Sequence, residues 1–258
     1  MITWHVIVER DGRPGGENMA ADVALLEEAE RSGRASLRLY RWDPPTLSFG
    51  RNEPVQDLYD LEEIARRRLA TVRRPTGGRT VWHEHELTYA VAAPIETFGS
   101  LRRAYVDIHQ RIATALQSLG VPATLAPHTG RPAPSLRSGQ AVRPSGRPHA
   151  CFATPAAGEL LVRGRKVAGS AQVRRRTAFL HHGSILLDGS QEIVRAVSRQ
   201  PSAVSGEITL ATVLERTVPF GELAAAIVAA WPAPLVPSGP PAAGQSDQPT
   251  HLAALARP

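Results

Sequence analysis

Cys151 and Lys166 are the only cysteine and the only lysine in the chain, and fifteen residues separate them. The chain has 30 lysines and arginines in all, so every other strongly basic side chain is an arginine. A lone lysine in such a chain indicates a need for a compact ammonium, which arginine cannot imitate. An ammonium near a thiol favours the thiolate, which is the nucleophile. The pair predicts a nucleophile with a cationic activator, whereas the alternative is a small, buried and inert cysteine.

A second distinctive segment is Arg-Arg-Pro-Thr-Gly-Gly-Arg, at residues 73–79. Gly77 and Gly78 let the backbone approach a ligand closely, because no Cβ intervenes. Arg74 beside them is of the type that holds a phosphate or carboxylate through two parallel hydrogen bonds. The competing interpretation is a tight hairpin with a solvated basic rim, and the glycine pair alone favours that interpretation.

The histidines allow two weaker hypotheses. His83 and His85 alternate with Glu84 and Glu86, but the HExxH spacing of a zinc helix is absent. No third ligand is evident, so we expect no metal and assign His83 a structural or substrate-lining role. The pair at residues 181–182 precedes a glycine and could contact substrate or end a turn, and the turn is the favoured interpretation.

Charge and composition limit the class of protein. The net charge is +6 and the isoelectric point is near 10.3, with arginine clusters at residues 66–68, 73–74 and 174–176. Aromatic residues make up only 5%, and no known nucleic-acid module is present, so an acidic protein partner or an anionic substrate suits the charge equally well. The last cluster is expected to be a solvated rim that is suited to docking an acidic carrier domain.

The expected location is the cytoplasm. A single cysteine excludes an internal disulfide and fits a reducing compartment. The N-terminus lacks a basic start followed by an apolar stretch, so we expect no signal peptide. The most apolar run, at residues 223–231, is too short to span a bilayer, so we expect no membrane association.

Apolar periodicity predicts an α+β domain in which strands and helices mix without regular alternation. Strands are expected at residues 4–9, 36–42 and 179–187, with two more in 71–93 joined around Gly77–Gly78, and a hairpin of 159–162 and 166–173 turning at Gly164. Helices are expected at residues 18–32, capped by Asn18 and ended by Gly33, and at 101–119, 191–199, 208–216 and 220–231. Residues 1–232 should form one catalytic domain containing a mobile loop at 126–149, and residues 233–258 a disordered tail.

The combined motifs resemble the biotin/lipoate protein ligase and lipoyl transferase superfamily. The segments that carry the resemblance are Asn-Met-Ala at 18–20, Tyr-Arg-Trp-Asp-Pro-Pro-Thr-Leu-Ser at 40–48, residues 73–79, and Gly-Arg-Lys-Val-Ala-Gly-Ser-Ala-Gln at 164–172. The likeness extends over about residues 3 to 230, in the order of the family. It implies a single mixed-sheet domain of the biotin/lipoate protein ligase catalytic type.

A cysteine at the start of a Cys-Phe element, upstream of the Gly-Arg-Lys lysine, resembles the cysteine-dependent octanoyltransferase branch. That resemblance implies catalysis by Cys151 and Lys166, with octanoyl-acyl carrier protein as donor and a lipoyl domain such as the glycine cleavage H protein as acceptor. No ATP or other cofactor is implied, because the acyl group arrives as a thioester. The implied substrate-binding residues are Arg74, Gly77, Gly78, His83, Gly169, Ser170 and Ala171.

Three alternatives stay open at this point. One is an ATP-dependent lipoate–protein ligase, and another is an amidotransferase that moves acyl groups between lipoyl domains. The third is a non-catalytic protein that binds a carrier domain or nucleic acid through its basic surface. The chain departs from the family pattern at Glu84, where aspartate is more frequent, and in the length of the loop before Cys151.

Overall fold

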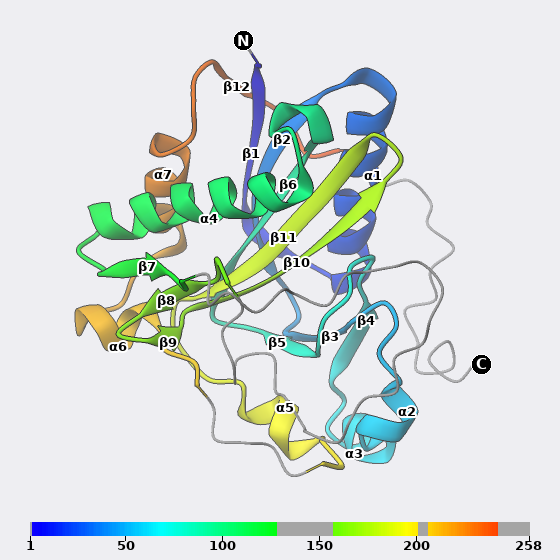
Figure 1. Cartoon of the computed structure of the whole chain (residues 1–258). Helices are drawn as coiled ribbons and strands as arrows, with labels where there is room; N and C mark the ends of the chain where they lie inside the picture. The colour runs from blue at the N-terminus through cyan, green and yellow to red at the C-terminus, as the bar shows by residue number, and fades with distance from the viewer. Residues whose placement is uncertain (1, 128–156, 201–205, 242–258) are drawn as a thin grey trace.

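The computed structural model describes residues 2–127, 157–200 and 206–241, and its centre is a mixed six-stranded sheet (Figure 1). In spatial order, its strands are β10 (Ala168–Arg175), β11 (Ala178–Leu186), β6 (Glu86–Pro94), β2 (Ala35–Trp42), β1 (Trp4–Arg13) and β12 (Leu235–Pro237). The β1 strand pairs in parallel with both β2 and β12, and the other neighbours are antiparallel. This architecture confirms the predicted α+β class.

Both faces of the sheet are covered. Three helices do this: α1 (Gly15–Ser32), α4 (Leu101–Ser118) and α7 (Phe220–Ala229). Along β6, Tyr89 and Val91 belong to the apolar cluster under α4 and α7, whereas Ala90 and Ala92 belong to the cluster under α1. Successive side chains of a strand point to opposite faces, so a strand is apolar on both faces where helices cover both of them, as it is at residues 89–93 of β6. Figure 1 shows α1 on one side of the sheet and α4 with α7 on the other.

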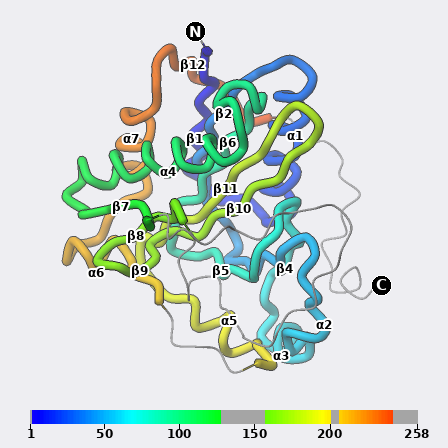
Figure 2. The backbone as a smooth tube through the Cα atoms, viewed as in Figure 1, coloured from blue at the N-terminus to red at the C-terminus, as the bar shows by residue number. Residues whose placement is uncertain are grey.

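Two small three-stranded sheets flank the central one. The first contains β4 (Ala70–Arg73), β3 (Thr46–Phe49) and β5 (Val81–His83), and the second contains β7 (Ala123–Leu125), β8 (Leu160–Val162) and β9 (Arg165–Lys166). The short helices are α2 (Val55–Leu58), α3 (Leu61–Arg66), η1 (Ile95–Thr97), α5 (Glu192–Ala196) and α6 (Leu210–Leu214). Figure 2 shows β3 to β5 with α2 and α3 at one end of the molecule. None of the helices within the described ranges is long and apolar enough to cross a membrane.

The first helix begins earlier than its sequence indicates. It starts at Gly15, after Pro14, and Asn18 lies inside it. The amide of Asn18 donates instead to the backbone carbonyls of Arg13 and Arg41, at 3.1 and 3.0 Å. Proline suits a helix start because its φ is already helical, so the cap was assigned to the wrong residue. The predicted end is confirmed, because Gly33 caps the helix in the left-handed conformation.

The two strands expected to pair around Gly77–Gly78 do not pair with each other. Both β4 and β5 pair with β3, one in parallel and the other antiparallel, so residues 74–80 cross over a third strand. Local pattern cannot reveal this, because β3 lies more than twenty residues upstream. The hairpin at Gly164 is confirmed for β8 and β9, but the expected second strand is divided at Val167, and β10 joins the central sheet.

The expected tail and loop fall partly within the structure. Leu235–Pro237, assigned to a disordered tail, instead pairs with β1, and residues 242–258 lie outside the described residues. Of the loop expected at 126–149, Ala126 is paired with Glu159 by a backbone hydrogen bond of 2.8 Å. Residues 128–149 are also outside the described ranges.

Candidate active site

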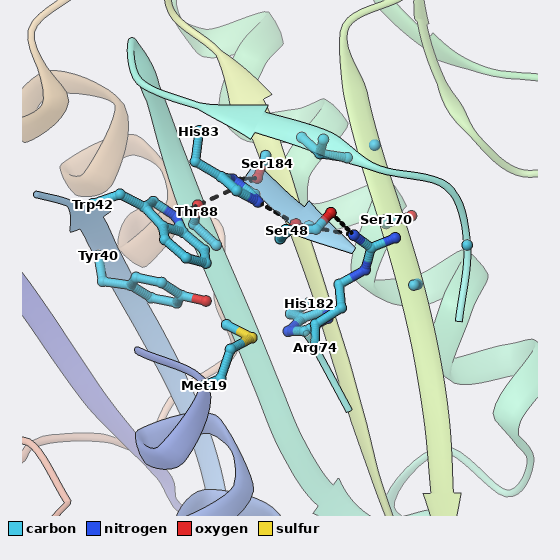
Figure 3. A pocket seen from close by; sticks show the side chains of 15 residues that line it. Met19, Tyr40, Trp42, Ser48, Arg74, His83, Thr88, Ser170, His182 and Ser184 are labelled. Atoms are coloured by element: carbon cyan, nitrogen blue, oxygen red, sulfur yellow. Dashed lines mark hydrogen bonds between the residues drawn. The ribbon is translucent and has the colours of Figure 1, made fainter. Parts of the chain in front are cut away.

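A pocket of about 430 Å³, measured with its open mouth, lies between α1, the central sheet and the loop at residues 74–80 (Figure 3). It is lined by Met19, Tyr40, Trp42, Ser48, Arg74, Gly78, Val81, His83, Thr88, Gly169, Ser170, Ala171, His182, Gly183 and Ser184. All of the predicted substrate-binding residues except Gly77 are in this lining, and Gly77 is exposed beside Gly78. The structure therefore brings together two motifs that are more than eighty residues apart.

Arg74 fastens the glycine loop to the neighbouring strand. Its Nη1 donates to the carbonyl and hydroxyl oxygens of Ser48, at 2.7 and 2.9 Å, and its Nη2 donates to the carbonyls of Arg79 and Gly77, at 2.6 and 3.1 Å. The loop also packs on Gly50, where an added Cβ would lie 2.0 Å from the Gly78 carbonyl oxygen. These bonds direct the guanidinium to backbone carbonyls, so the arginine shapes the pocket wall.

His83 is held by a carboxylate on one side and a hydroxyl on the other. Its Nδ1 lies 2.6 Å from Glu86 Oε1, and its Nε2 lies 2.6 Å from Ser48 Oγ. The ring stacks on Trp42 with centroids 4.0 Å apart (Figure 3). Because a carboxylate accepts the Nδ1 proton, the ring is fixed in orientation as one wall of the pocket. His85, in contrast, has a side chain that is 59% exposed and does not share this site.

Asp22 and His182 form a second buried cluster, which the sequence analysis did not identify. His182 Nδ1 donates to Asp22 at 2.9 Å, and its Nε2 lies 2.7 Å from the hydroxyl of Thr76 in the glycine loop. Burial alone would raise the pKa of Asp22, but the bond from His182 and the charge of Arg38 hold that pKa below its ordinary value. The expectation of a turn at residues 181–182 was wrong, because both histidines are buried within β11.

Lys166 lies at the end of β9 and is only 4% exposed. Its Nζ donates to Glu159 Oε1 at 2.8 Å, so the ammonium and the carboxylate form a buried ion pair. Strand β10 begins two residues later and carries Gly169, Ser170 and Ala171 along the pocket. The other predicted catalytic residue, Cys151, lies outside the described residues.

A third cluster, around His109 on α4, connects the lysine region with the pocket. His109 Nδ1 lies 2.7 Å from the carbonyl oxygen of Gly158, and its Nε2 lies 3.0 Å from the hydroxyl of Ser170. Burial lowers the pKa of His109 to about 4, the Lys166 charge lowers it further, and the Gly158 bond opposes the shift. The ring is therefore neutral near pH 7. A carbonyl can only accept, so Nδ1 carries the proton and Nε2 accepts from Ser170.

Weak signals for the missed residues were present in the sequence. Arg38 stands within the apolar run of β2, and Asp22 lies on the apolar stripe of α1. A charged side chain at a buried position requires a partner, so Arg38 and Asp22 each indicate that an oppositely charged residue lies nearby. His109 carried no comparable signal, because its partners Gly158 and Ser170 come from distant segments. Glu159 lies only seven residues from Lys166, in the expected hairpin, so its pairing could have been inferred. Among the residues that the structure describes, no group of three His, Cys, Asp or Glu side chains is arranged to hold a metal.

The chain is similar to known proteins of one family. Residues 14–231 match the family model described as the lipoyl protein ligase A/B catalytic domain. The chain is 37% identical over 243 residues to octanoyltransferase LipM of Symbiobacterium thermophilum. The aligned region covers 88% of this chain and 85% of that protein. It is 38% identical over 235 residues to octanoyltransferase LipM of Kyrpidia tusciae, with coverage of 89% and 82%.

Solved structures share the fold at lower identity. A bi-partite lipoate protein ligase from Thermoplasma acidophilum superposes with a TM-score of 0.66 at 16% identity, covering 89% of this chain and 82% of that one. A lipoate-protein ligase A bound with ATP superposes with a TM-score of 0.64 at 18% identity, with coverage of 89% and 84%. At such identities the likeness establishes the shared architecture alone.

Proposed function

This chain belongs to the lipoyl protein ligase A/B catalytic-domain family, and we propose that it moves an octanoyl group from octanoyl-acyl carrier protein, through a thioester on Cys151, to a lysine of a lipoyl domain. Octanoyltransferase activity in protein lipoylation follows from the LipM relatives, which match most of the chain at 37 to 38% identity. The thioester, the identity of the donor and the residues that act are our proposal.

The observation that carries the proposal is the narrow pocket beside β10. The side chains of Met19, Tyr40 and Trp42 lie together on one side (Figure 3). The small residues Gly169 and Ala171 of β10 also line the pocket. A saturated eight-carbon chain fits such a lining, because each buried CH₂ contributes about 0.8 kcal/mol. The polar groups around the pocket already bond one another, as His83 does with Ser48 and Glu86, so they do not require a polar ligand.

In the first step, the Cys151 thiolate attacks the carbonyl carbon of the donor thioester. The bond from that carbon to the carrier sulfur breaks, and the departing thiolate takes up a proton. The Lys166 ammonium favours the Cys151 thiolate and offers a charge to the oxyanion of the tetrahedral intermediate. The product is an octanoyl thioester on the enzyme.

In the second step, the neutral amine of the acceptor lysine attacks the enzyme thioester. The carbon–sulfur bond breaks, Cys151 leaves as the thiolate, and the nitrogen loses its proton to give an amide. An amide is more stable than a thioester, so transfer is downhill without ATP, and we propose no cofactor. We propose a cytoplasmic location, where a reducing environment keeps the single thiol available.

For the acceptor, membership of a lipoylation family implies a lipoyl domain, and we propose one of the glycine cleavage H protein type. The chain carries a net charge of +6, and the cluster at Arg174–Arg176 is exposed at the end of β10. A basic surface of this kind accelerates encounter with acidic carrier domains.

Intact mass spectrometry after mixing with octanoyl-acyl carrier protein, without ATP, tests the proposal. We expect one octanoyl group on the protein, removable by hydroxylamine, absent from Cys151→Ala and discharged by adding a lipoyl domain. Unchanged transfer by Cys151→Ala would contradict the thioester. Labelling that requires ATP and free lipoate would indicate a ligase, and labelling only from an acylated lipoyl domain would indicate an amidotransferase.

A further inference from the structure

The ion pair between Lys166 and Glu159 is buried on both sides. The side chains are 4% and 10% exposed, and Nζ lies 2.8 Å from Oε1. A buried ammonium without a compensating charge is costly, and the usual response is to lose the proton. An adjacent carboxylate offsets that cost, so Glu159 supplies the counter-charge of the buried ammonium. It also restricts the orientation of a flexible side chain.

Glu159 is itself held by backbone hydrogen bonds. Its carbonyl oxygen accepts from Ala126 at 2.8 Å, and the preceding Gly158 N–H donates to the Ala126 carbonyl at 2.9 Å. Gly158 has a φ of 83°, a left-handed conformation that favours glycine, and an added Cβ would meet the Tyr105 ring at 3.5 Å. The backbone of Gly158 and Glu159 is therefore tied to Ala126.

His109 supplies the remaining contact. Its Nδ1–H donates to the carbonyl oxygen of Gly158 at 2.7 Å, one residue before Glu159. Its Nε2 accepts from Ser170, which lines the acyl pocket, at 3.0 Å. One neutral imidazole thus joins the backbone that carries Glu159 to the pocket wall.

We propose that Glu159 and His109 are positioning residues for acyl transfer. Glu159 pairs with the Lys166 ammonium and fixes its orientation, and His109 keeps Glu159 in place relative to the pocket. The inference rests on the proposed function, because it takes Lys166 as the activator of Cys151. It goes beyond that function by assigning roles to two residues that do not touch the reacting atoms.

The proposal makes a prediction opposite in sign to simple electrostatics. A carboxylate near a thiol disfavours the thiolate, so removing its charge should by itself make Cys151 more reactive. If Glu159 acts instead by holding the Lys166 ammonium in the orientation that activates the thiol, removing its charge should make Cys151 less reactive. The direction of the change therefore identifies the role.

The first experiment measures alkylation of the only cysteine by iodoacetamide at pH 7, so no other thiol contributes. We expect Glu159→Gln to slow alkylation roughly tenfold or more and Glu159→Asp to restore most of the rate. Glu222→Gln, which removes a carboxylate from an exposed pair with Arg216, is the matched control and should leave the rate unchanged. Melting temperature and near-ultraviolet circular dichroism monitor folding. An unchanged or faster rate in Glu159→Gln overturns the role of Glu159.

The second experiment separates the Gly158 contact of His109 Nδ1 from the contacts of Nε2, which lies near the hydroxyls of Ser170 and Tyr89. Asparagine places an amide N–H near the Nδ1 position and can still donate to Gly158, whereas glutamine reaches the Nε2 position and retains only the Ser170 side. We expect His109→Asn to keep kcat for octanoyl transfer within about threefold of wild type, and His109→Gln to lower it roughly tenfold, with KM for the donor little changed in both. Equal losses in the two variants, or a loss confined to KM, overturn the role of His109.

Failure of the proposed function would look different. If the wild-type protein formed no thioester with octanoyl-acyl carrier protein, the proposed donor or nucleophile would be wrong, whatever the alkylation rates. If wild type formed the thioester and Glu159→Gln formed it equally fast, only the positioning role would be wrong. The mass and alkylation measurements together distinguish these outcomes.

Discussion

Two buried cations, Arg38 on β2 and Lys166 on β9, are held in different ways. Arg38 is fully buried, and its guanidinium donates to Glu9, to Asp22 at 2.9 Å, and to both oxygens of Asn18 at 2.7 and 3.1 Å. Its guanidinium carbon also lies 3.8 Å from the centroid of the Tyr40 ring. Lys166 donates to the carboxylate of Glu159 at 2.8 Å and lies two residues before the strand that lines the pocket.

The difference follows from the chemistry of the two side chains. The guanidinium of arginine is planar and has five N–H donors, so it can join a helix to a sheet through several acceptors at once. It also stays charged at any pH at which the protein is folded. A compact ammonium has a movable head and exchanges protons more readily, which suits a group that must stabilise a transient charge. We therefore interpret Arg38 as part of the scaffold behind the pocket and Lys166 as part of the reaction.

The largest effect is expected from replacing Arg38, the cation of the scaffold. Arg38→Met should lower the free energy of unfolding by about 3–5 kcal/mol, because it removes the buried cation that Glu9 and Asp22 share and leaves them only the ion pairs with Arg13 and His182. Arg38→Lys should recover part of this loss, because lysine restores the positive charge but not the planar set of N–H donors. Urea denaturation measures both variants, and a loss in Arg38→Met no greater than that of an exposed arginine would show that the cluster contributes little.

Replacing Lys166 should affect the rate of octanoyl transfer more than the stability of the folded protein. Lys166→Arg keeps the charge, but its larger planar head cannot occupy the same place, so we expect octanoyl transfer to fall roughly 100-fold, or about 2.7 kcal/mol. The melting temperature should also fall, because a larger head at this buried position overpacks its surroundings, so the rate is measured where the variant is still folded. Single-turnover formation of the thioester is the measurement, and a rate near that of wild type would remove the distinction between the two cations.

The smallest expected effect concerns pH and stability near the lysine. The pKa of His109 is about 4 in the folded protein, below its ordinary value of about 6.5, and the titratable groups facing it are Tyr89, Tyr105, His181 and Lys166. The unfolded chain binds more protons between these values, so the stabilising contribution of neutral His109 is complete above about pH 6.5. It is lost as the pH falls towards 4.

At pH 5 this loss amounts to about 2 kcal/mol. His109→Asn removes the titrating group, so its unfolding free energy should vary less steeply than that of wild type between pH 6.5 and 5. His181, whose pKa is also lowered by burial, keeps part of the slope in both proteins. Denaturation at several pH values provides the test, and parallel curves for the two proteins would contradict it.

Sequence pattern predicted the long elements well and the short ones poorly. The helix at 101–118 and the strands around 35–42 and 178–186 have strong apolar periodicity and lie within a residue or so of the predicted limits. The β3, β4 and β5 strands are three or four residues long, and their pairing depends on segments far apart in the chain. The start of α1 was misassigned because Asn18 has the type of a capping residue but is used for a tertiary contact.

By itself, the sequence determined the class of domain, the residue types available for chemistry and the motifs that indicate the family. A unique cysteine, a unique lysine and the two glycine-containing motifs can be recognised without coordinates, because they depend on residue type and local spacing. Only the tertiary structure decided which side chains complete the site. Asp22 with His182, Glu86 with His83 and His109 with Gly158 come from different elements, and burial makes each polar group depend on the partner that the fold brings to it.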